Sequence, residues 1–187
     1  TENIYWSYFH KNDILFSIQN GQLDFKSSPI LIGNNSRLTT LTQQSHFIDD
    51  SLKCSIDLQV ADSKIRTLAY NISKGLLFDY AKVLAVHDWV AENIYYDLDT
   101  LRSGQYRYND VTAVGTLTAK KGVCQGISNL SIALLRSMGI PAYGLTCFAL
   151  GVSTTGGWGK QNNLCAPANH QITIAYVDKR WIIMDIT

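Results

Sequence analysis

Three side chains that together can catalyse acyl transfer lie far apart in the sequence: Cys124, His170 and Asp185. A thiol attacks a carbonyl carbon as its thiolate, and because a free cysteine has a pKa of about 8.5, a reactive one needs positive potential nearby. A histidine can take the thiol proton and return it to a leaving amine, while a carboxylate on its other ring nitrogen fixes the ring. The sequence therefore predicts a catalytic set with Cys124 as nucleophile, His170 as base and Asp185 as orienting residue.

The surroundings of Cys124 favour this interpretation over a structural one. A cysteine in an apolar context is more often a small buried hydrophobe. Cys124, however, begins a helical pattern, and the unpaired N–H groups at a helix N-terminus stabilise an anion. Gly122 and Gly126 flank it, and we expect them to leave room for a substrate backbone. The backbone amide of Cys124 is then the expected oxyanion donor.

Apolar residues at helical spacing predict the elements that position the cysteine. Four stretches show this pattern, at 61–75, 79–96, 110–119 and 124–139. In the first, Asp62 or Ser63 is the expected N-cap and Gly75 the C-terminal cap. In the last, Gly139 ends the helix that Cys124 begins.

The histidine and the aspartate fall on a predicted β-hairpin. Alternating residues predict three strands, at 142–150, 170–177 and 180–186, the last two joined by a two-residue turn at Asp178-Lys179. With that turn, residue 177 pairs with 180 and residue 172 with 185. Asp185 is therefore expected diagonally next to His170, on the same side of the pleat.

Helices followed by an antiparallel sheet predict an α+β fold, with the cysteine at a helix N-terminus packed on the sheet. This core is expected to span residues 61–187. In residues 1–60, alternating aromatic or branched and polar residues predict a β-rich N-terminal extension of unclear role. No element is predicted for residues 35–55, and residues 97–109 are expected to form a surface loop.

Four blocks of the sequence resemble the bacterial transglutaminase-like superfamily: KVLAVHDWVAENIYYD (82–97), GVCQGISNLSIALLRSMGIPA (122–142), NHQITI (169–174) and RWIIMDIT (180–187). The resemblance covers residues 62–187 and is most specific at the Gly-Val-Cys-Gln-Gly block. It implies a papain-like thiol fold, with the family's cysteine, histidine and aspartate at Cys124, His170 and Asp185. Ile172 departs from the family, which often has a tryptophan two positions after the histidine.

Members of that superfamily cross-link proteins, hydrolyse peptides or amides, or have lost activity. The resemblance therefore implies an enzyme that forms an acyl-thioester on Cys124 from a glutamine or peptide amide and passes it to an amine or to water. The alternatives are a cysteine protease or amidase, and a non-catalytic binding module of a larger surface protein. The expected partner is a protein or peptide substrate, and Trp158 is predicted to line its groove, with Trp181 and Tyr176 nearby.

Other clusters of polar residues are weaker signals, and no metal or cofactor is predicted. Cys147, Cys165 and His170 invite a zinc interpretation, but the sequence offers no second close pair of ligands. A calcium loop of spaced carboxylates is not found either. Tyr95 or Tyr96 could bring a hydroxyl near the oxyanion, although packing is the usual role of such tyrosines.

Composition and charge exclude some classes of function. The 187 residues are 46% hydrophobic and carry a formal net charge of +1, which argues against an electrostatic footprint for nucleic acid. No apolar run approaches the length of about 18 residues that spans a bilayer, and no signal-peptide pattern opens the chain. Because the chain begins at Thr1 without a methionine, we expect a piece of a longer bacterial protein, secreted or at the cell surface.

Overall fold

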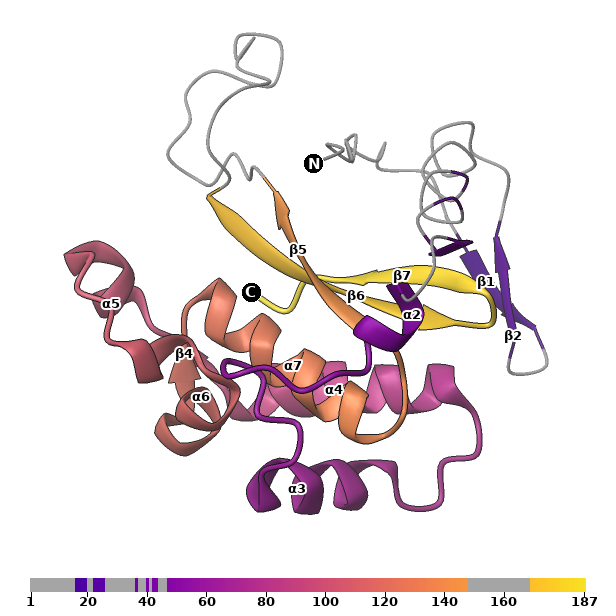
Figure 1. The fold of residues 1–187 in the computed structure, drawn as a ribbon, viewed down its shortest axis with the longest axis horizontal. Helices are drawn as coiled ribbons and strands as arrows, with labels where there is room; N and C mark the ends of the chain where they lie inside the picture. Colours follow the sequence, from indigo (N-terminus) through magenta and orange to yellow (C-terminus); the bar gives the residue numbers. More distant parts are fainter. Residues whose placement is uncertain are drawn as a thin grey trace, which may run out of the picture.

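The computed structural model describes residues 47–147 and 169–187, together with residues 16–19, 22–25, 36, 40, 42 and 43. In this part, a three-stranded antiparallel sheet packs on helices, and helix α7 lies between the sheet and helices α3 and α4 (Figure 1). The predicted α+β fold is confirmed. The helical elements are α2 (Phe47–Asp50), α3 (Ser63–Ser73), α4 (Asp79–Asn93), α5 (Leu98–Ser103), the 3-10 turn η1 (Tyr108–Val111), α6 (Ala113–Ala119) and α7 (Cys124–Ser137).

The strands form three small groups. Strands β5 (Ala142–Cys147), β6 (His170–Val177) and β7 (Arg180–Met184) make the antiparallel sheet, in that order. Strands β3 (Tyr95–Tyr96) and β4 (Lys121–Gly122) form a short parallel pair, and β1 (Phe16–Gln19) and β2 (Gln22–Phe25) an antiparallel pair. The β1 and β2 pair agrees with the strands predicted in the N-terminal extension.

Helix α7 is the centre of the core because almost every position along it is buried. Leu130, Leu134 and Leu135 are fully buried between α3, α4 and the sheet, and each such side chain contributes about 1.5–3 kcal/mol relative to exposure. The helix ends near Gly139, whose φ of +80° is a left-handed conformation that favours glycine. The predicted helix at 124–139 is thus confirmed to within two residues of its end.

Helices α3 and α4 confirm two further predictions. Asp62 caps α3, and its carboxylate accepts a hydrogen bond from the Lys64 amide over 2.8 Å. Gly75 follows the helix with a φ of +81°, as expected for a C-terminal cap. Val86 and Val90 on α4 are fully buried, and they face α7 at the helical spacing seen in the sequence.

The sheet has the predicted hairpin. Asp178 and Lys179 both have positive φ, at 51° and 63°, which fits a two-residue turn between right-twisted strands. The register pairs Val177 with Arg180 and runs to Thr173 opposite Met184. Strand β7 ends there, two residues earlier than predicted, so Asp185 follows the strand directly.

The segment expected to be a surface loop, residues 97–109, is largely helical, so this prediction was wrong. Asp97 caps α5 by accepting a hydrogen bond from the Thr100 amide over 3.1 Å, and Gly104 ends the helix with a φ of +63°. No residue of α5 is buried, and its six residues hold only two apolar side chains, Leu98 and Leu101, so it lacks the long apolar pattern that reveals α4 or α7. The short helix predicted at 110–119 begins three residues later, at Ala113.

The chain before residue 61 contacts the core in several places. The amide of Ala142 donates to the Ser51 carbonyl over 3.0 Å, and the amide of Ala113 donates to the Asp57 carbonyl over 2.8 Å. Trp181, on β7, donates from its indole nitrogen to Thr42 Oγ1 over 2.8 Å. Helix α2 lies in the stretch where no element was predicted. The boundary at residue 60 and the role of the extension stay predictions.

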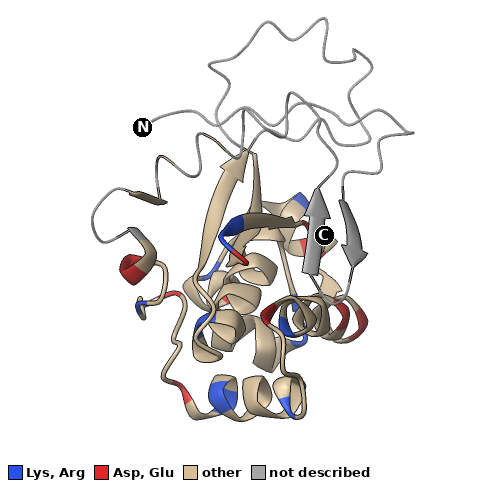
Figure 2. Cartoon of the chain, turned by 90° about the vertical axis from the view of Figure 1, so that its right-hand side faces the viewer, with Lys and Arg blue, Asp and Glu red and all other residues tan. Residues whose placement is uncertain are grey.

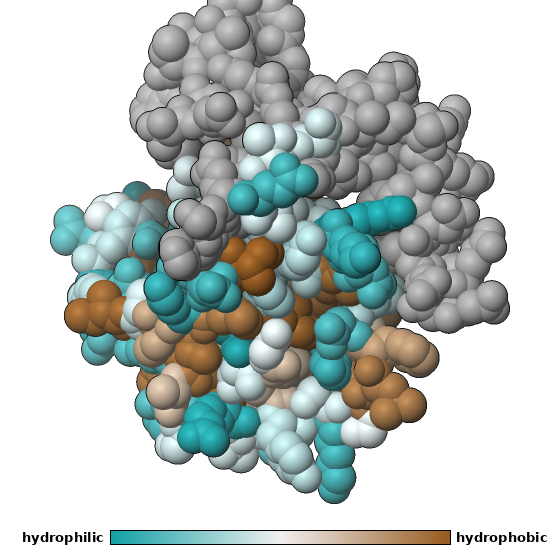
Figure 3. Space-filling view, turned by 45° about the vertical axis from the view of Figure 1, so that its right-hand side comes forward, coloured by the Kyte–Doolittle hydropathy of each residue, from teal (hydrophilic) through white to brown (hydrophobic). Residues whose placement is uncertain are grey.

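The described surface carries both signs of charge and some apolar side chains. Figure 2 shows basic and acidic residues together on the helical layer, and Figure 3 shows apolar side chains between polar ones on one face. None of the described helices combines the length and apolar composition that a membrane crossing requires.

Candidate active site

Cys124 is the first residue of α7, and its position depends on tight packing beneath the first helical turn. A Cβ added to Gly126 would lie 2.5 Å from Thr116 Oγ1 and 2.8 Å from the Asp110 carbonyl oxygen. A Cβ on Gly122 would come within 3.0 Å of Thr116 Cγ2. The two glycines therefore make room for Thr116 and the η1 backbone inside the protein. The expectation that they open space for a substrate was wrong.

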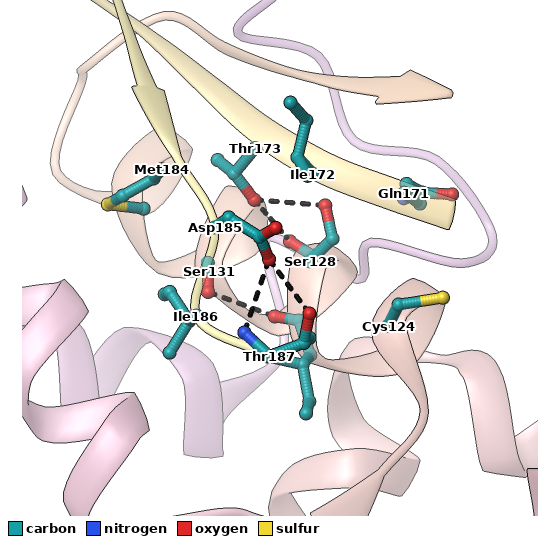
Figure 4. A pocket seen from close by; sticks show the side chains of 11 residues that line it. Cys124, Ser128, Ser131, Gln171, Ile172, Thr173, Met184, Asp185, Ile186 and Thr187 are labelled. Atoms are coloured by element: carbon teal, nitrogen blue, oxygen red, sulfur yellow. Dashed lines mark hydrogen bonds between the residues drawn. The ribbon is translucent and has the colours of Figure 1, made fainter. Parts of the chain in front are cut away.

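His170 and Asp185 meet at the end of the hairpin. His170 Nε2 lies 2.9 Å from Asp185 Oδ2, although the histidine begins β6 and the aspartate follows β7. Thr187 fixes the carboxylate, since its Oγ1 and its amide donate to Asp185 Oδ1 over 2.8 and 3.2 Å (Figure 4). Because Asp185 occupies Nε2, the other ring nitrogen of His170 is left for the hydrogen bond with Cys124.

The pKa values of Cys124, His170 and Asp185 are shifted in the directions that favour a charged thiolate and imidazolium. Burial by itself raises the pKa of Cys124, but a hydrogen bond with His170 and the backbone amides of Gln171 and Gln125 outweigh it, so the pKa lies below its ordinary value. Hydrogen bonds with Asp185 and Cys124 raise the pKa of His170 to about 10 against the effect of burial. For Asp185, burial favours the neutral acid, but the hydrogen bonds from His170 and Thr187 prevail and lower its pKa. A thiolate beside an imidazolium is the state that these shifts favour.

Buried polar contacts align the helix of Cys124 with the strand of His170. Ser128 and Thr173 share a hydrogen bond of 2.9 Å between their hydroxyls, and Gln171 Nε2 donates to Asn129 Oδ1 over 3.1 Å. The first pair joins α7 to β6 in the wall of a pocket that also includes Cys124 and Asp185 (Figure 4). Because such contacts have directional geometry, they fix the helix against sliding along the strand.

Tyr96 is a site residue to which the sequence did not point clearly. Its hydroxyl receives a hydrogen bond from the backbone amide of Cys124 and makes another with the Cys124 thiol. Its neighbour Tyr95 is 75% exposed. A signal was present in the sequence, since alternate residues of a strand face opposite sides. The two-residue length of β3 made that strand invisible to pattern analysis.

The remaining predicted residues have different outcomes. Trp158 and Cys165 lie outside the described residues. Trp181 is only 4% exposed and packs against Tyr176, with ring centroids 5.2 Å apart, so its predicted place at a substrate groove was wrong. Cys147 is opposite His170 in the sheet register, and burial raises its pKa. Among the described residues, no cluster of His, Cys, Asp or Glu has the arrangement of a metal site.

Comparison with known proteins identifies relatives of this chain. The model of the transglutaminase-like superfamily matches residues 66–186. The UPF0252 protein MJ1282 of Methanocaldococcus jannaschii is 28% identical over 130 residues, which are 64% of this chain and 35% of that protein.

The fold is similar to that of other proteins whose crystal structures are known. A candidate cysteine protease from Cytophaga hutchinsonii is 28% identical, with a TM-score of 0.59, and the match covers 82% of this chain and 47% of that one. A candidate protease from Parabacteroides distasonis is 17% identical, with a TM-score of 0.50, and the match covers 82% of this chain and 27% of that one. At this identity the similarity supports the fold alone. The chain thus spans less than half the length of each of these relatives.

Proposed function

This chain belongs to the transglutaminase-like superfamily, and from that premise we propose that it is a thiol enzyme that transfers acyl groups. It forms an acyl-thioester on Cys124 from a glutamine or peptide amide and passes the acyl group to an amine or to water. The observation that carries the proposal is the hydrogen-bonded order of Cys124, His170 and Asp185, with the pKa of the thiol lowered and that of the imidazole raised.

In the first half-reaction, the Cys124 thiolate attacks the amide carbon, and the carbonyl oxygen becomes an oxyanion. The Cys124 amide, at the N-terminus of α7, is positioned to donate to that oxygen. The His170 imidazolium gives its proton to the amide nitrogen, so that the C–N bond breaks and ammonia or an amine leaves. The products are a thioester on Cys124 and a neutral imidazole on His170.

In the second half-reaction, His170 acts as a base. It removes a proton from an incoming primary amine or water, which attacks the thioester carbon, and the C–S bond breaks to regenerate the thiolate. Asp185 holds the ring through Nε2 and stabilises the imidazolium that forms again. An amine acceptor gives an isopeptide-type amide, whereas water gives a carboxylate.

The hydrolytic outcome is the second candidate function. It is favoured by the likeness to the C. hutchinsonii protein, which is described as a candidate cysteine protease. A non-catalytic binding module explains the site less well, because a fold kept only for binding does not require a thiol with a lowered pKa beside an imidazolium.

Product analysis separates these functions. The protein is incubated with a glutamine-containing peptide and a dansyl-labelled primary amine, and the masses of the products are measured. We expect a peptide carrying the dansyl amine in place of ammonia. Deamidated or cleaved peptide without the adduct identifies a hydrolase instead.

Two variants control this experiment. Cys124→Ala removes the proposed nucleophile and should abolish every product. Cys54→Ala removes an exposed thiol outside the site and should keep the wild-type yield. If a broad peptide library gives neither adduct nor hydrolysis although Cys124 is readily alkylated, the acyl-transfer proposal fails and the binding module takes its place.

A further inference from the structure

Tyr96 makes two polar contacts at the place where an acyl carbonyl oxygen must sit. The Cys124 amide, the backbone donor of the proposed reaction, gives its hydrogen to the Tyr96 hydroxyl oxygen. The same hydroxyl is hydrogen-bonded to the Cys124 thiol. A carbonyl whose carbon bonds to that sulfur has its oxygen about 3 Å from the amide nitrogen in an oxyanion hole, and therefore also near the phenol.

The backbone holds Tyr96 in this position through the parallel pair of β3 and β4. Tyr96 is in register with Gly122, two residues before Cys124. The amide of Tyr95 donates to the Lys120 carbonyl, and the amide of Asp97 donates to the Gly122 carbonyl, each over 3.0 Å. These two bonds flank Tyr96 and tie it to the segment that leads into α7.

A side-chain contact reinforces this pair. Asp97 Oδ2 lies 2.8 Å from Lys121 Nζ, which links the residue after Tyr96 to the residue before Gly122. Asp97 also caps α5, so the residue that follows β3 is held by both β4 and α5. Strand alternation turns Tyr95 to solvent, where it is 75% exposed, and Tyr96 to the thiol.

We infer that Tyr96 is a catalytic residue that supplies the side-chain donor of the oxyanion hole, opposite the Cys124 amide; the inference rests on the proposed acyl transfer. In the resting site the amide donates to the phenol oxygen. When the tetrahedral intermediate forms, its oxyanion replaces the phenol oxygen as the acceptor of the amide N–H, and the displaced phenol donates its O–H to the same oxyanion without losing its proton. Burial raises the pKa of Tyr96, so the phenol keeps the proton that it must donate.

Two reagents distinguish this role from packing and from control of the thiol. p-Nitrophenyl acetate acylates a thiolate through a tetrahedral oxyanion, and the released nitrophenolate measures the acylation rate. Iodoacetamide alkylates the same thiolate by direct displacement at a saturated carbon, and no oxyanion forms. The ratio of the two rates therefore reports oxyanion stabilisation alone, whatever the natural substrate is.

We expect Tyr96→Phe to lower the acylation rate by about 10²-fold, as the loss of one oxyanion donor does, while the alkylation rate changes far less. Tyr95→Phe is the matched control, because it removes a hydroxyl from the exposed neighbour, and both of its rates should equal those of the wild type. Thermal unfolding of Tyr96→Phe should stay close to that of the wild type, since the ring is kept and only the hydrogen bonds of the hydroxyl with Cys124 are lost.

Other outcomes overturn the inference. Unchanged rates would assign Tyr96 to packing, equal loss of both rates would assign it to activation of the thiol, and a rise in both would show that the hydroxyl obstructs the thiol. Failure of the proposed function looks different: the wild-type protein would be alkylated at Cys124 but would transfer no acyl group from any peptide. The ratio measured with the ester would still decide the role of Tyr96.

Discussion

Gln171 Nε2 donates to Asn129 Oδ1 over 3.1 Å, which connects the residue after His170 to the helix that begins with Cys124. Asn129 is 6% exposed and also donates to the Val111 carbonyl over 2.8 Å. One buried amide therefore joins α7, β6 and the last residue of η1. The distance between nucleophile and base is held by side chains that touch neither reacting atom.

Gln171→Ala should lower the free energy of unfolding by about 1–3 kcal/mol, because Asn129 Oδ1 is left buried without its donor. The backbone amide of Gln171, which bonds to Cys124, is retained in this variant. The rate of Cys124 alkylation should therefore stay close to that of the wild type even though the free energy of unfolding falls. Urea unfolding and iodoacetamide kinetics measure the two effects, with the exposed Gln125→Ala as control. A large loss of alkylation without loss of stability would show that the Gln171 side chain acts on the thiol directly.

Cys124 should be the thiol that reacts first with iodoacetamide at mildly acidic pH. Burial by itself raises its pKa, but the hydrogen bond with His170 and those from the backbone amides of Gln171 and Gln125 together lower it, whereas burial raises the pKa of Cys147. His170→Ala should therefore move the midpoint of Cys124 alkylation to higher pH. Peptide mapping after limited labelling measures this directly. Preferential labelling of Cys147 or Cys54 would remove the support for Cys124 as nucleophile.

His170 and Cys124 together determine how the free energy of unfolding depends on pH. For His170, a pKa raised from 6.5 to about 10 gives a contribution that is complete below pH 6.5 and is lost as the pH rises towards 10. For Cys124, a lowered pKa gives the opposite contribution, present above pH 9.0 and lost as the pH falls through the folded value. Thiolate with imidazolium holds one proton, as thiol with imidazole does in the unfolded chain, so the two effects offset each other between these values.

In the variant Cys124→Ala, the contribution of His170 to the pH dependence of stability should no longer be offset by Cys124. Asp185 still raises the pKa of His170 in this variant, so its free energy of unfolding should fall as the pH rises above 6.5, while the wild type changes much less. Urea unfolding at a series of pH values tests this. Parallel profiles for the two proteins would show that Cys124 adds no pH dependence of its own and therefore stays a neutral thiol in the folded wild type.

The sequence predicted those parts of the fold that depend on local pattern. Helices α4 and α7 carry apolar residues on a continuous buried face, so their bounds followed within a few residues. The register of β6 and β7 followed from the two-residue turn at Asp178 and Lys179. That register brought His170 and Asp185 together correctly, because the period of a strand leaves one choice of face.

The parts that depend on contacts between distant segments were missed. Trp181 was expected near the substrate, but its burial depends on the segment of Thr42, 139 residues away. The role of Gly126 depends on Thr116 beneath it, and the place of Tyr96 depends on a strand of two residues. Helix α5 has no buried face, so its sequence resembles a loop.

Asp185→Asn should fold normally and lose much of its activity. The neutral side-chain amide of asparagine does not stabilise the imidazolium, so the pKa of His170 falls and less thiolate forms. By analogy with other triads, the activity should fall by about 10²–10⁴-fold. Cys124→Ala should lose more, because no thioester can form. Activities are compared at matched melting temperatures. Equal activity of the wild type and Asp185→Asn would mean that another group orients His170, and Asn169, directly before it, would be replaced next.

Gly126→Ala tests whether the packing beneath Cys124 holds the nucleophile in place. The new methyl group would lie 2.5 Å from Thr116 Oγ1 and 2.8 Å from the Asp110 carbonyl oxygen, so α7 must shift or the stability must fall by about 1–3 kcal/mol. Thr116→Ala is the matched variant, because it removes a buried hydroxyl that has no hydrogen-bond partner among the described residues and alone should cost little.

The double variant Gly126→Ala with Thr116→Ala then separates the two contacts. Removal of Thr116 Oγ1 relieves the shorter one and leaves the backbone carbonyl of Asp110 in the way, so it should recover part of the stability lost by Gly126→Ala. Urea unfolding measures this coupling, and iodoacetamide kinetics on the same samples show whether Cys124 moves with the helix. If the two substitutions were strictly additive, Thr116 would not be what requires glycine at position 126, and the backbone carbonyl of Asp110 would be the remaining explanation.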